Sequence, residues 1–186
     1  MNDNDLFSLV LDKDETIIKT FRPNKSRAWF GTIITIILLA IIFIPMTIVA
    51  FISVPEEGAL ESGIFCLAFL IIYAVVVCIL IALWCNKTVY AVTNKRVLIR
   101  TGYIGVDYKS LDYSMVGAFT VNVNWIDKLL RKNTGSLAFG SMASPMTNGT
   151  VAKFNFSYID NPYEVYKEIK ELIDDSKAKK EAIENK

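Results

Sequence analysis

Two long runs without a charged residue constrain the fold of this chain more than any other feature. Residues 28–55 and 62–86 contain no Asp, Glu, Lys or Arg, and most of their side chains are apolar. A helix rises about 1.5 Å per residue, so either run can cross a hydrocarbon core about 30 Å thick. The sequence therefore predicts two transmembrane helices, at about residues 29–52 and 63–85, joined by a short loop into a hairpin.

Neither a signal peptide nor a soluble core helix accounts as well for the apolar runs. A cleaved signal peptide has an apolar core of only about 7–15 residues, whereas the first run is longer and begins well into the chain. A buried core helix of a soluble protein is rarely so long. Pro45 lies inside the first span, where it removes one backbone hydrogen bond and favours a kink that a membrane helix tolerates.

The distribution of basic residues predicts the orientation of the hairpin. Lys and Arg flank its two outer ends, whereas the connecting loop carries acidic residues and no basic ones. The residues are Lys19, Arg22, Lys25 and Arg27 before the hairpin, Lys87, Lys95, Arg96 and Arg100 after it, and Glu56, Glu57 and Glu61 in the loop. The positive-inside rule then predicts a multi-pass protein of the plasma membrane with both termini in the cytoplasm.

Outside the hairpin, the pattern changes to short β segments. Residues 1–28 form a polar N-terminal segment, in which 6–11 are compatible with a short helix and 16–21 with a strand. Asn94 is expected in a hairpin turn, where its side chain tolerates a positive φ. Predicted strands after the hairpin cover residues 87–93, 96–102, 106–113, 115–124, 135–142 and 151–159.

A C-terminal helix closes the chain. It begins near Pro162 and carries an apolar stripe of Val165, Tyr166, Ile169, Leu172 and Ile173, and a charged tail follows at 175–186. One helix cannot cover both faces of a flat sheet. We therefore expect an α+β fold, in which the transmembrane hairpin precedes a bent antiparallel β-sandwich or barrel at residues 86–174, capped by this helix. Phe154, Phe156 and Tyr158 should share one face of the last strand.

Three segments in this order resemble a known family. They are YAVTNKRVLIRTGYIG at 90–105, WIDKLLRKNTGSLAFGS at 125–141 and IDNPYEVYKEI at 159–169. Together with the hairpin they resemble the bacterial pleckstrin-homology (PH)-like domain, second type, over about residues 15–172. The resemblance implies a PH-like sheet of seven strands capped by a helix, and it supplies no catalytic residues. Asn133-Thr134 departs from the family, which more often has a second small residue before the glycine at 135.

No arrangement of residues in the sequence indicates an enzyme. The chain has no His, no P-loop and no dinucleotide-binding glycine motif. Asp107, Asp112, Asp127 and Asp160 are scattered and are interpreted as solvated or turn residues. The three cysteines, Cys66, Cys78 and Cys85, are interpreted as packing residues of the second span. We therefore expect no catalytic residues, no metal, no cofactor and no nucleic-acid partner.

Two basic segments are the candidates for binding. In the segment 124–132, Trp125 lies beside Lys128, Arg131 and Lys132, and a helix there could rest on an anionic leaflet, where each basic residue contributes about 1 kcal/mol. The alternative is that its apolar face packs on the barrel. The second cluster is Lys95, Arg96 and Arg100; it could hold a phosphate, although a solvated strand edge is the interpretation that the sequence favours.

Three functional hypotheses follow. The first is a membrane-anchored binding or scaffold module that contacts a protein partner, a second copy of itself or the membrane surface. The second is a subunit of an envelope transport complex, which the lack of charges inside the spans disfavours. The third is an enzyme acting on lipid or envelope precursors, which the lack of a catalytic constellation disfavours.

Overall fold

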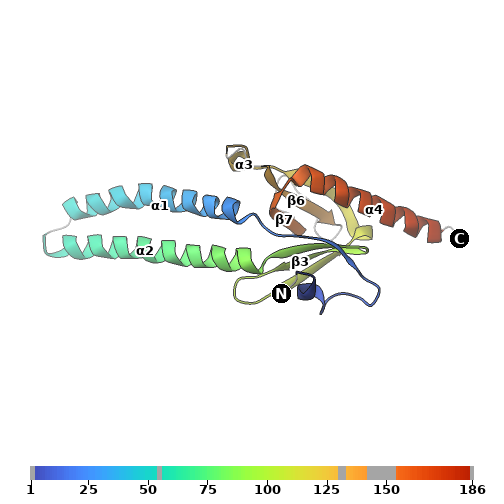
Figure 1. Cartoon of the computed structure of the whole chain (residues 1–186). Helices are drawn as coiled ribbons and strands as arrows, with labels where there is room; N and C mark the ends of the chain where they lie inside the picture. The colour runs from blue at the N-terminus through green and yellow to red at the C-terminus, as the bar shows by residue number, and fades with distance from the viewer. Residues whose placement is uncertain (1–2, 54–55, 130–132, 142–153, 185–186) are drawn as a thin grey trace.

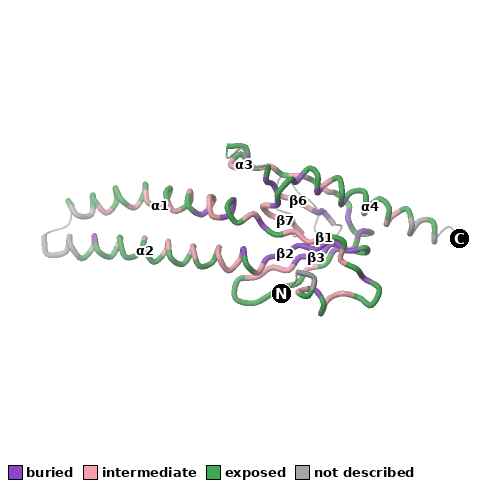
Figure 2. The backbone as a smooth tube through the Cα atoms, in the orientation of Figure 1, coloured by how far each residue is buried: buried purple, intermediate pink, exposed green. Residues whose placement is uncertain are grey.

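The computed structural model consists of a long helical hairpin that projects from one end of a β domain (Figure 1). It describes residues 3–53, 56–129, 133–141 and 154–184. Helices α1 (Lys25–Ser53) and α2 (Glu56–Lys87) form the hairpin, and both are long and apolar enough to cross a membrane. Their large apolar side chains are exposed along most of the length (Figure 2), which contradicts a core helix of a soluble protein.

The domain is built from two antiparallel sheets. The first has the strand order β1-β2-β3-β4 and the second the order β5-β6-β7. The strands are β1 (Ile17–Phe21), β2 (Val89–Thr93), β3 (Arg96–Thr101), β4 (Asp107–Asp112), β5 (Val116–Asn122), β6 (Thr134–Ser141) and β7 (Phe154–Asp160). The expected α+β architecture and its seven strands are confirmed.

Strand β1 precedes the hairpin in the chain but belongs to the first sheet. It pairs with β2, with Thr20 opposite Ala91 and Phe21 opposite Tyr90. The domain therefore contains residues from both sides of the hairpin, and the segment 1–28 is not separate from it. Strand β1 leads directly into α1, and α2 leads directly into β2. Because β1 and β2 are neighbours, both helices join the domain at the same end (Figure 1).

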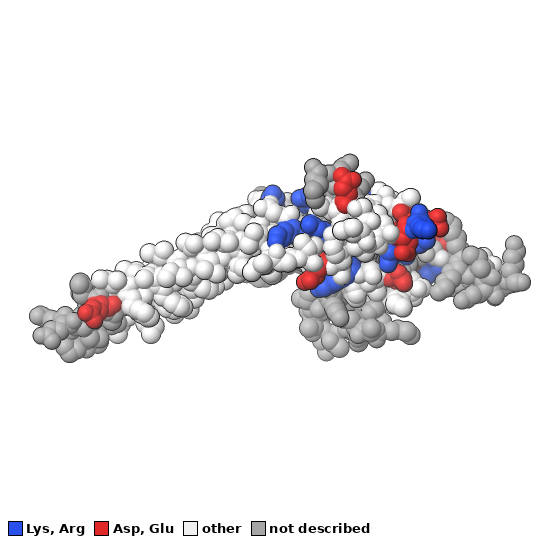
Figure 3. Space-filling view, turned by 90° about the horizontal axis from the view of Figure 1, so that it is seen from below, with Lys and Arg blue, Asp and Glu red and all other residues white. Residues whose placement is uncertain are grey.

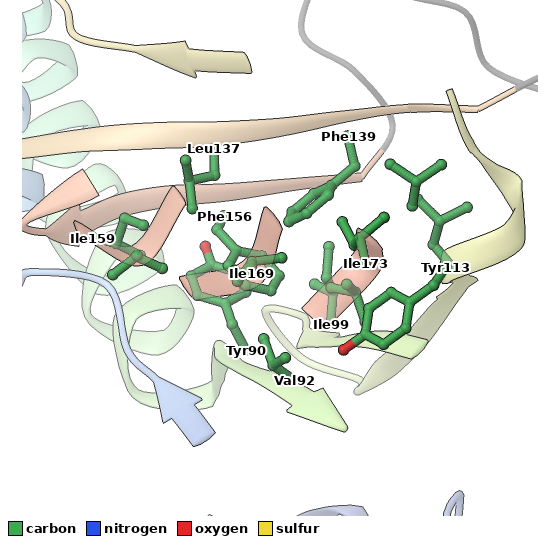
Figure 4. Close-up of a cluster of buried hydrophobic side chains, with 14 residues drawn as sticks. Tyr90, Val92, Ile99, Tyr113, Leu137, Phe139, Phe156, Ile159, Ile169 and Ile173 are labelled. Atoms are coloured by element: carbon green, nitrogen blue, oxygen red, sulfur yellow. The ribbon is translucent and has the colours of Figure 1, made fainter. Parts of the chain in front are cut away.

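The main core lies between the two sheets and the C-terminal helix α4 (Pro162–Glu184). Tyr90 and Phe156 stack with ring centroids 4.5 Å apart, and Phe139 meets Phe156 edge-on at 5.1 Å. Figure 4 shows Ile169 and Ile173 of α4 pointing into this cluster from the open side of the bent sheet. The predicted stripe of α4 thus caps the domain, and α4 continues through the predicted charged tail as far as Glu184.

The outer face of the first sheet has a cover of its own, which the sequence pattern did not predict. The short 3-10 helix η1 (Asp3–Phe7) and the residues after it pack Phe7 against Val89, Ala91 and Leu98. All five residues of β2 are buried because side chains cover both faces of this central strand. The N-terminal segment is therefore part of the folded domain.

Asn94 lies in the β2–β3 hairpin turn, as predicted, but without a positive φ. Its side-chain oxygen accepts a hydrogen bond from the backbone N–H of Thr16, and Thr93 Oγ1 accepts those of Lys95 and Arg96 to shape the turn. One local prediction was wrong. Tyr158 does not join the core face of β7. The register of β6 and β7 shifts at this point, Tyr158 adopts φ 57°, and Ile159 takes the core position.

Candidate membrane-facing site

The hairpin is joined to the domain by a network of buried polar groups. Arg27, in the first turn of α1, donates from Nε to Asp127 Oδ1, and each of these residues is only 2% exposed. Asp127 belongs to the short helix α3 (Trp125–Leu129). It also accepts hydrogen bonds from Thr134 Oγ1 at 2.7 Å and from the backbone N–H of Asn124 at 3.1 Å. This ion pair fixes α3 beside the start of α1.

The interpretation of Asp127 as a solvated residue was therefore wrong. Arg27 and Asp127 are separated by 100 residues, so no local pattern could have paired them. The departure from the family pattern noted at Thr134 now has a structural role, because its hydroxyl binds the buried carboxylate. A buried charge needs both a partner of opposite charge and further hydrogen bonds. For the Asp127 carboxylate, Arg27 supplies the opposite charge and Thr134 a further hydrogen bond.

Further contacts attach α1 to the end of β7. Asn24 caps α1, with its side-chain oxygen accepting the N–H of Arg27 at 2.9 Å, and its amide donates to Asp160 Oδ1 at 2.7 Å. The Arg27 guanidinium lies over the ring of Tyr158, 4.9 Å from its centroid. The Tyr158 ring also packs edge-to-face with Trp84 of α2, with ring centroids 5.9 Å apart. The left-handed backbone at Tyr158 thus turns its ring toward the hairpin instead of the core.

Helix α3 presents apolar side chains to the outside. Trp125 is 62% and Leu129 66% exposed, and Lys128 beside them is exposed as well. The alternative in which this apolar face packs on the barrel does not hold for these two residues. Of the site residues predicted in the segment 124–132, the structure describes Trp125 and Lys128, whereas Arg131 and Lys132 lie outside the described residues. Figure 1 shows α3 at the level where α1 enters the domain.

The β3–β4 loop forms a second apolar tip that the sequence did not reveal. Ile104 is 89% exposed, and Tyr103 and Val106 next to it are exposed too. Lys87, the last residue of α2, donates from Nζ to the carbonyl oxygen of Ile104 at 2.7 Å. The loop therefore lies against the domain end of α2 and points back along the hairpin, away from α3 (Figures 1 and 2).

Gly102 explains the shape of this loop. It has φ +156°, and a Cβ built there would lie 2.2 Å from the carbonyl oxygen of Gly105. Only glycine fits such a close approach of two backbone segments. Gly102 thus allows the tight turn that presents Tyr103 and Ile104.

The second predicted basic cluster is not one site. Arg96 donates to both carboxylate oxygens of Glu15, at 2.7–3.2 Å, and to the carbonyl oxygen of Val10. Arg100, at the other end of β3, donates to the carbonyl oxygen of Lys87 at 3.0 Å, and Lys95 is exposed in the β2–β3 turn. The structure gives Arg96 and Arg100 separate partners within the protein instead of a shared anion site.

The pair of Glu15 and Arg96 holds the N-terminal segment in place. Burial alone would raise the pKa of Glu15, but hydrogen bonds from Arg96, Thr93 and the backbone N–H of Asp12 outweigh it and lower the pKa from 4.5 to about 2. The hydrogen bonds with Glu15 also raise the pKa of Arg96. The pair therefore stays ionised at neutral pH.

The charges of the hairpin are divided between its two ends. Figure 3 shows Lys and Arg gathered where the hairpin meets the domain, a stretch without charged residues along the helices, and acidic atoms toward the far end. Lys25, Arg27 and Lys87 lie at the domain end, while Glu61 is exposed in the part of α2 remote from the domain.

These features define a class of protein. Two antiparallel sheets with seven strands in total, capped by a C-terminal helix, are consistent with a PH-like fold, and here a long apolar hairpin is inserted between the first two strands. The chain matches the family described as Bacterial PH domain over residues 16–173, so it belongs to that family. The match includes β1 and the hairpin. No curated protein and no solved structure matches the chain.

Proposed function

We propose that this protein is a membrane-anchored PH-like binding module whose domain is held against the cytoplasmic leaflet of the plasma membrane. In this proposal α1 and α2 span the bilayer and both termini lie in the cytoplasm. The observation that carries the proposal is the pair of apolar tips, α3 and the β3–β4 loop, which flank the hairpin where it enters the domain.

The chemistry of the two tips supports contact with a bilayer. Trp and Tyr favour the headgroup level of a membrane, and Trp125 and Tyr103 supply one of each. Leu129 and Ile104 beside them can leave water on contact with lipid, which favours binding by about 25 cal/mol per Å² of apolar area. Lys128 adds attraction to an anionic leaflet, of about 1 kcal/mol.

The sidedness in the proposal rests on charge. The basic residues at the domain end and the acidic residues of the far turn match the positive-inside rule if the domain is cytoplasmic. Rigid attachment then has a functional consequence. A domain fixed at the membrane surface meets other membrane proteins at a high effective concentration, which favours a scaffold that captures a protein partner.

Spin labelling in liposomes tests the proposal. In a protein with Cys66, Cys78 and Cys85 replaced by Ala, single cysteines are placed at Ile104 and, as a matched control, at Met115, which is 59% exposed but adjoins the distal part of α4. We expect the label at 104 to be accessible to oxygen dissolved in the bilayer, and the label at 115 to be accessible to an aqueous nickel chelate. Equal aqueous access at both positions would contradict membrane contact.

The sidedness has a separate test. In the same background, we expect Glu61→Cys to react with an impermeant maleimide added to intact cells, and Tyr163→Cys on α4 to react only after lysis. The opposite pattern would place the domain outside and overturn the cytoplasmic assignment.

A further inference from the structure

An open groove runs between the edge strand β1 and the helix α4. It consists of two adjoining hollows of about 210 and 560 Å³, which share Lys19, Phe21 and Glu168 as lining residues. Strand β1 is the last strand of its sheet, with β2 on one side and no strand on the other among the described residues. Its residues 18–21 line the groove.

The floor of the groove is apolar and its rim is acidic. Phe21 and Val92 of the sheet and Ile169 and Leu172 of α4 contribute apolar surface, and Ile18 on β1 is exposed beside them. Five carboxylates line the two hollows, against two basic side chains, Lys19 and Arg22. The carboxylates belong to Asp160, Glu164, Glu168, Glu171 and Asp175.

Most of this acidic charge is not balanced within the groove. Lys19 pairs with Glu168 at 2.7 Å, and both side chains are about half exposed, so this bridge is a weak surface pair. Even with Lys19 and Arg22 counted as neutralising two carboxylates, three remain. Such a rim attracts cationic groups and repels phosphate or an anionic lipid headgroup.

The groove begins at the hairpin and leads away from it. Asp160 and Glu164 lie at the hairpin end, where Asp160 accepts a hydrogen bond from Asn24, the residue before α1. Along α4 the rim continues to Asp175, and the helix rises about 16 Å between Glu164 and Asp175. That length accommodates about five residues of an extended strand.

We infer that this groove binds an extended, basic and partly apolar peptide segment, which adds to β1 as a further strand with its Lys and Arg side chains on the acidic rim. An unpaired strand edge with pockets for alternate side chains is the usual basis of strand addition. The inference deepens the proposed function by naming the partner class. Cytoplasmic juxtamembrane segments of other membrane proteins are rich in Lys and Arg, and in the proposed orientation they would emerge beside the hairpin end of the groove.

Peptide binding to the full-length protein in detergent tests the inference without a bilayer, so its outcome is independent of membrane contact by the tips. The probe is a fluorescent seven-residue peptide of alternating Lys and Val, measured by anisotropy, and the matched probe alternates Glu and Val. We expect the basic probe to bind and the acidic probe not to bind. Equal binding of both probes, or binding of neither, would overturn the inference.

Variants and a backbone-modified probe locate the binding. Reversing two exposed rim charges, Glu164→Lys with Glu171→Lys, should weaken binding of the basic probe about tenfold, whereas Asp174→Lys, on the same helix but outside the groove lining, should change it less than about twofold. N-methylation of alternate amides in the probe should abolish binding, because it blocks strand pairing but keeps the charge.

Two results would contradict this assignment. An N-methylated probe that binds as well as the unmodified one would show that charge attraction alone is responsible. Self-association of the protein that is lost in the Glu164→Lys/Glu171→Lys variant would assign the groove to a second copy of the chain instead of a basic peptide.

Discussion

Among the ion pairs that join residues 3–27 to residues after the hairpin, two have a deeply buried carboxylate, and they differ in what they hold. Arg27 and Asp127 are both almost fully buried, and they attach α3 to the first turn of α1. Glu15 is equally buried, but its partner Arg96 keeps 17% of its side chain exposed, and this pair attaches the N-terminal segment to the sheet. One pair thus orients the domain on the hairpin, and the other completes the domain itself.

This difference shows how an inserted hairpin is accommodated in the fold. The chain leaves the domain after β1 and returns at β2, and pairing of these two strands alone would leave the domain free to tilt about the junction. The ion pair of Arg27 with Asp127, together with Asn24 and Tyr158, adds contacts away from the sheet. These contacts should restrict that tilt. The first three predictions that follow test the contrast between the two pairs, and the fourth concerns the β3–β4 loop.

The largest loss of stability is expected from Asp127→Ala. It leaves the Arg27 guanidinium buried without its carboxylate, which typically destabilises a protein by about 3–5 kcal/mol. Denaturant unfolding of the detergent-solubilised protein measures this, with the exposed Asp107→Ala as control. A spin label at position 125 should also become more mobile. If Asp127→Ala were as stable as Asp107→Ala, the pair would not be the link that we describe.

A smaller loss is expected from Glu15→Gln. Glutamine can keep a hydrogen bond with Thr93, but the partly solvated Arg96 loses its charge partner, so we expect a cost of about 2 kcal/mol. The N-terminal segment should loosen while α3 stays in place. Faster tryptic cleavage after Lys13, with unchanged mobility of a spin label at position 125, would show that the two ion pairs hold different parts of the protein. Unchanged cleavage would argue against a role for Glu15 in holding the segment.

The same pair predicts a response to acid. Because folding lowers the pKa of Glu15 from 4.5 to about 2, its contribution to stability is complete above about pH 4.5 and is lost as the pH falls toward 2. As the pH falls through this window, the free energy of unfolding of the wild type should therefore decrease by more than that of Glu15→Gln. Parallel pH profiles of the two proteins would refute the assignment.

The smallest effect concerns the β3–β4 loop. Gly102→Ala introduces a Cβ where the carbonyl oxygen of Gly105 would be 2.2 Å away, so the loop must change shape at a cost of about 1–2 kcal/mol. Gly105→Ala is the matched control, since nothing lies within 4 Å of its added Cβ, and it should change stability by less than about 0.5 kcal/mol. Equal unfolding midpoints for the two variants would show that the loop is not constrained at Gly102.

Local patterns in the sequence predicted most of the elements but not how distant segments meet. The stripe of α4 and the alternation of Phe154 and Phe156 in β7 follow from neighbouring residues and were predicted correctly, whereas Tyr158 was not. The role of Asp127 depends on an arginine 100 residues away, and Glu15 depends on an arginine 81 residues away. Ile104 lies between two predicted strands, and no local pattern shows that it lies against the end of α2, where Lys87 binds its carbonyl oxygen.

The most direct test of the account is the depth of Trp125 in a bilayer. A protein with Trp29→Phe and Trp84→Phe retains Trp125 as its single tryptophan. In liposomes that contain anionic lipid, we predict that its fluorescence is quenched by lipids brominated near the headgroup and is shielded from aqueous acrylamide. Quenching by acrylamide to the same extent in liposomes and in detergent, with no effect of the brominated lipids, would contradict a domain held against the membrane.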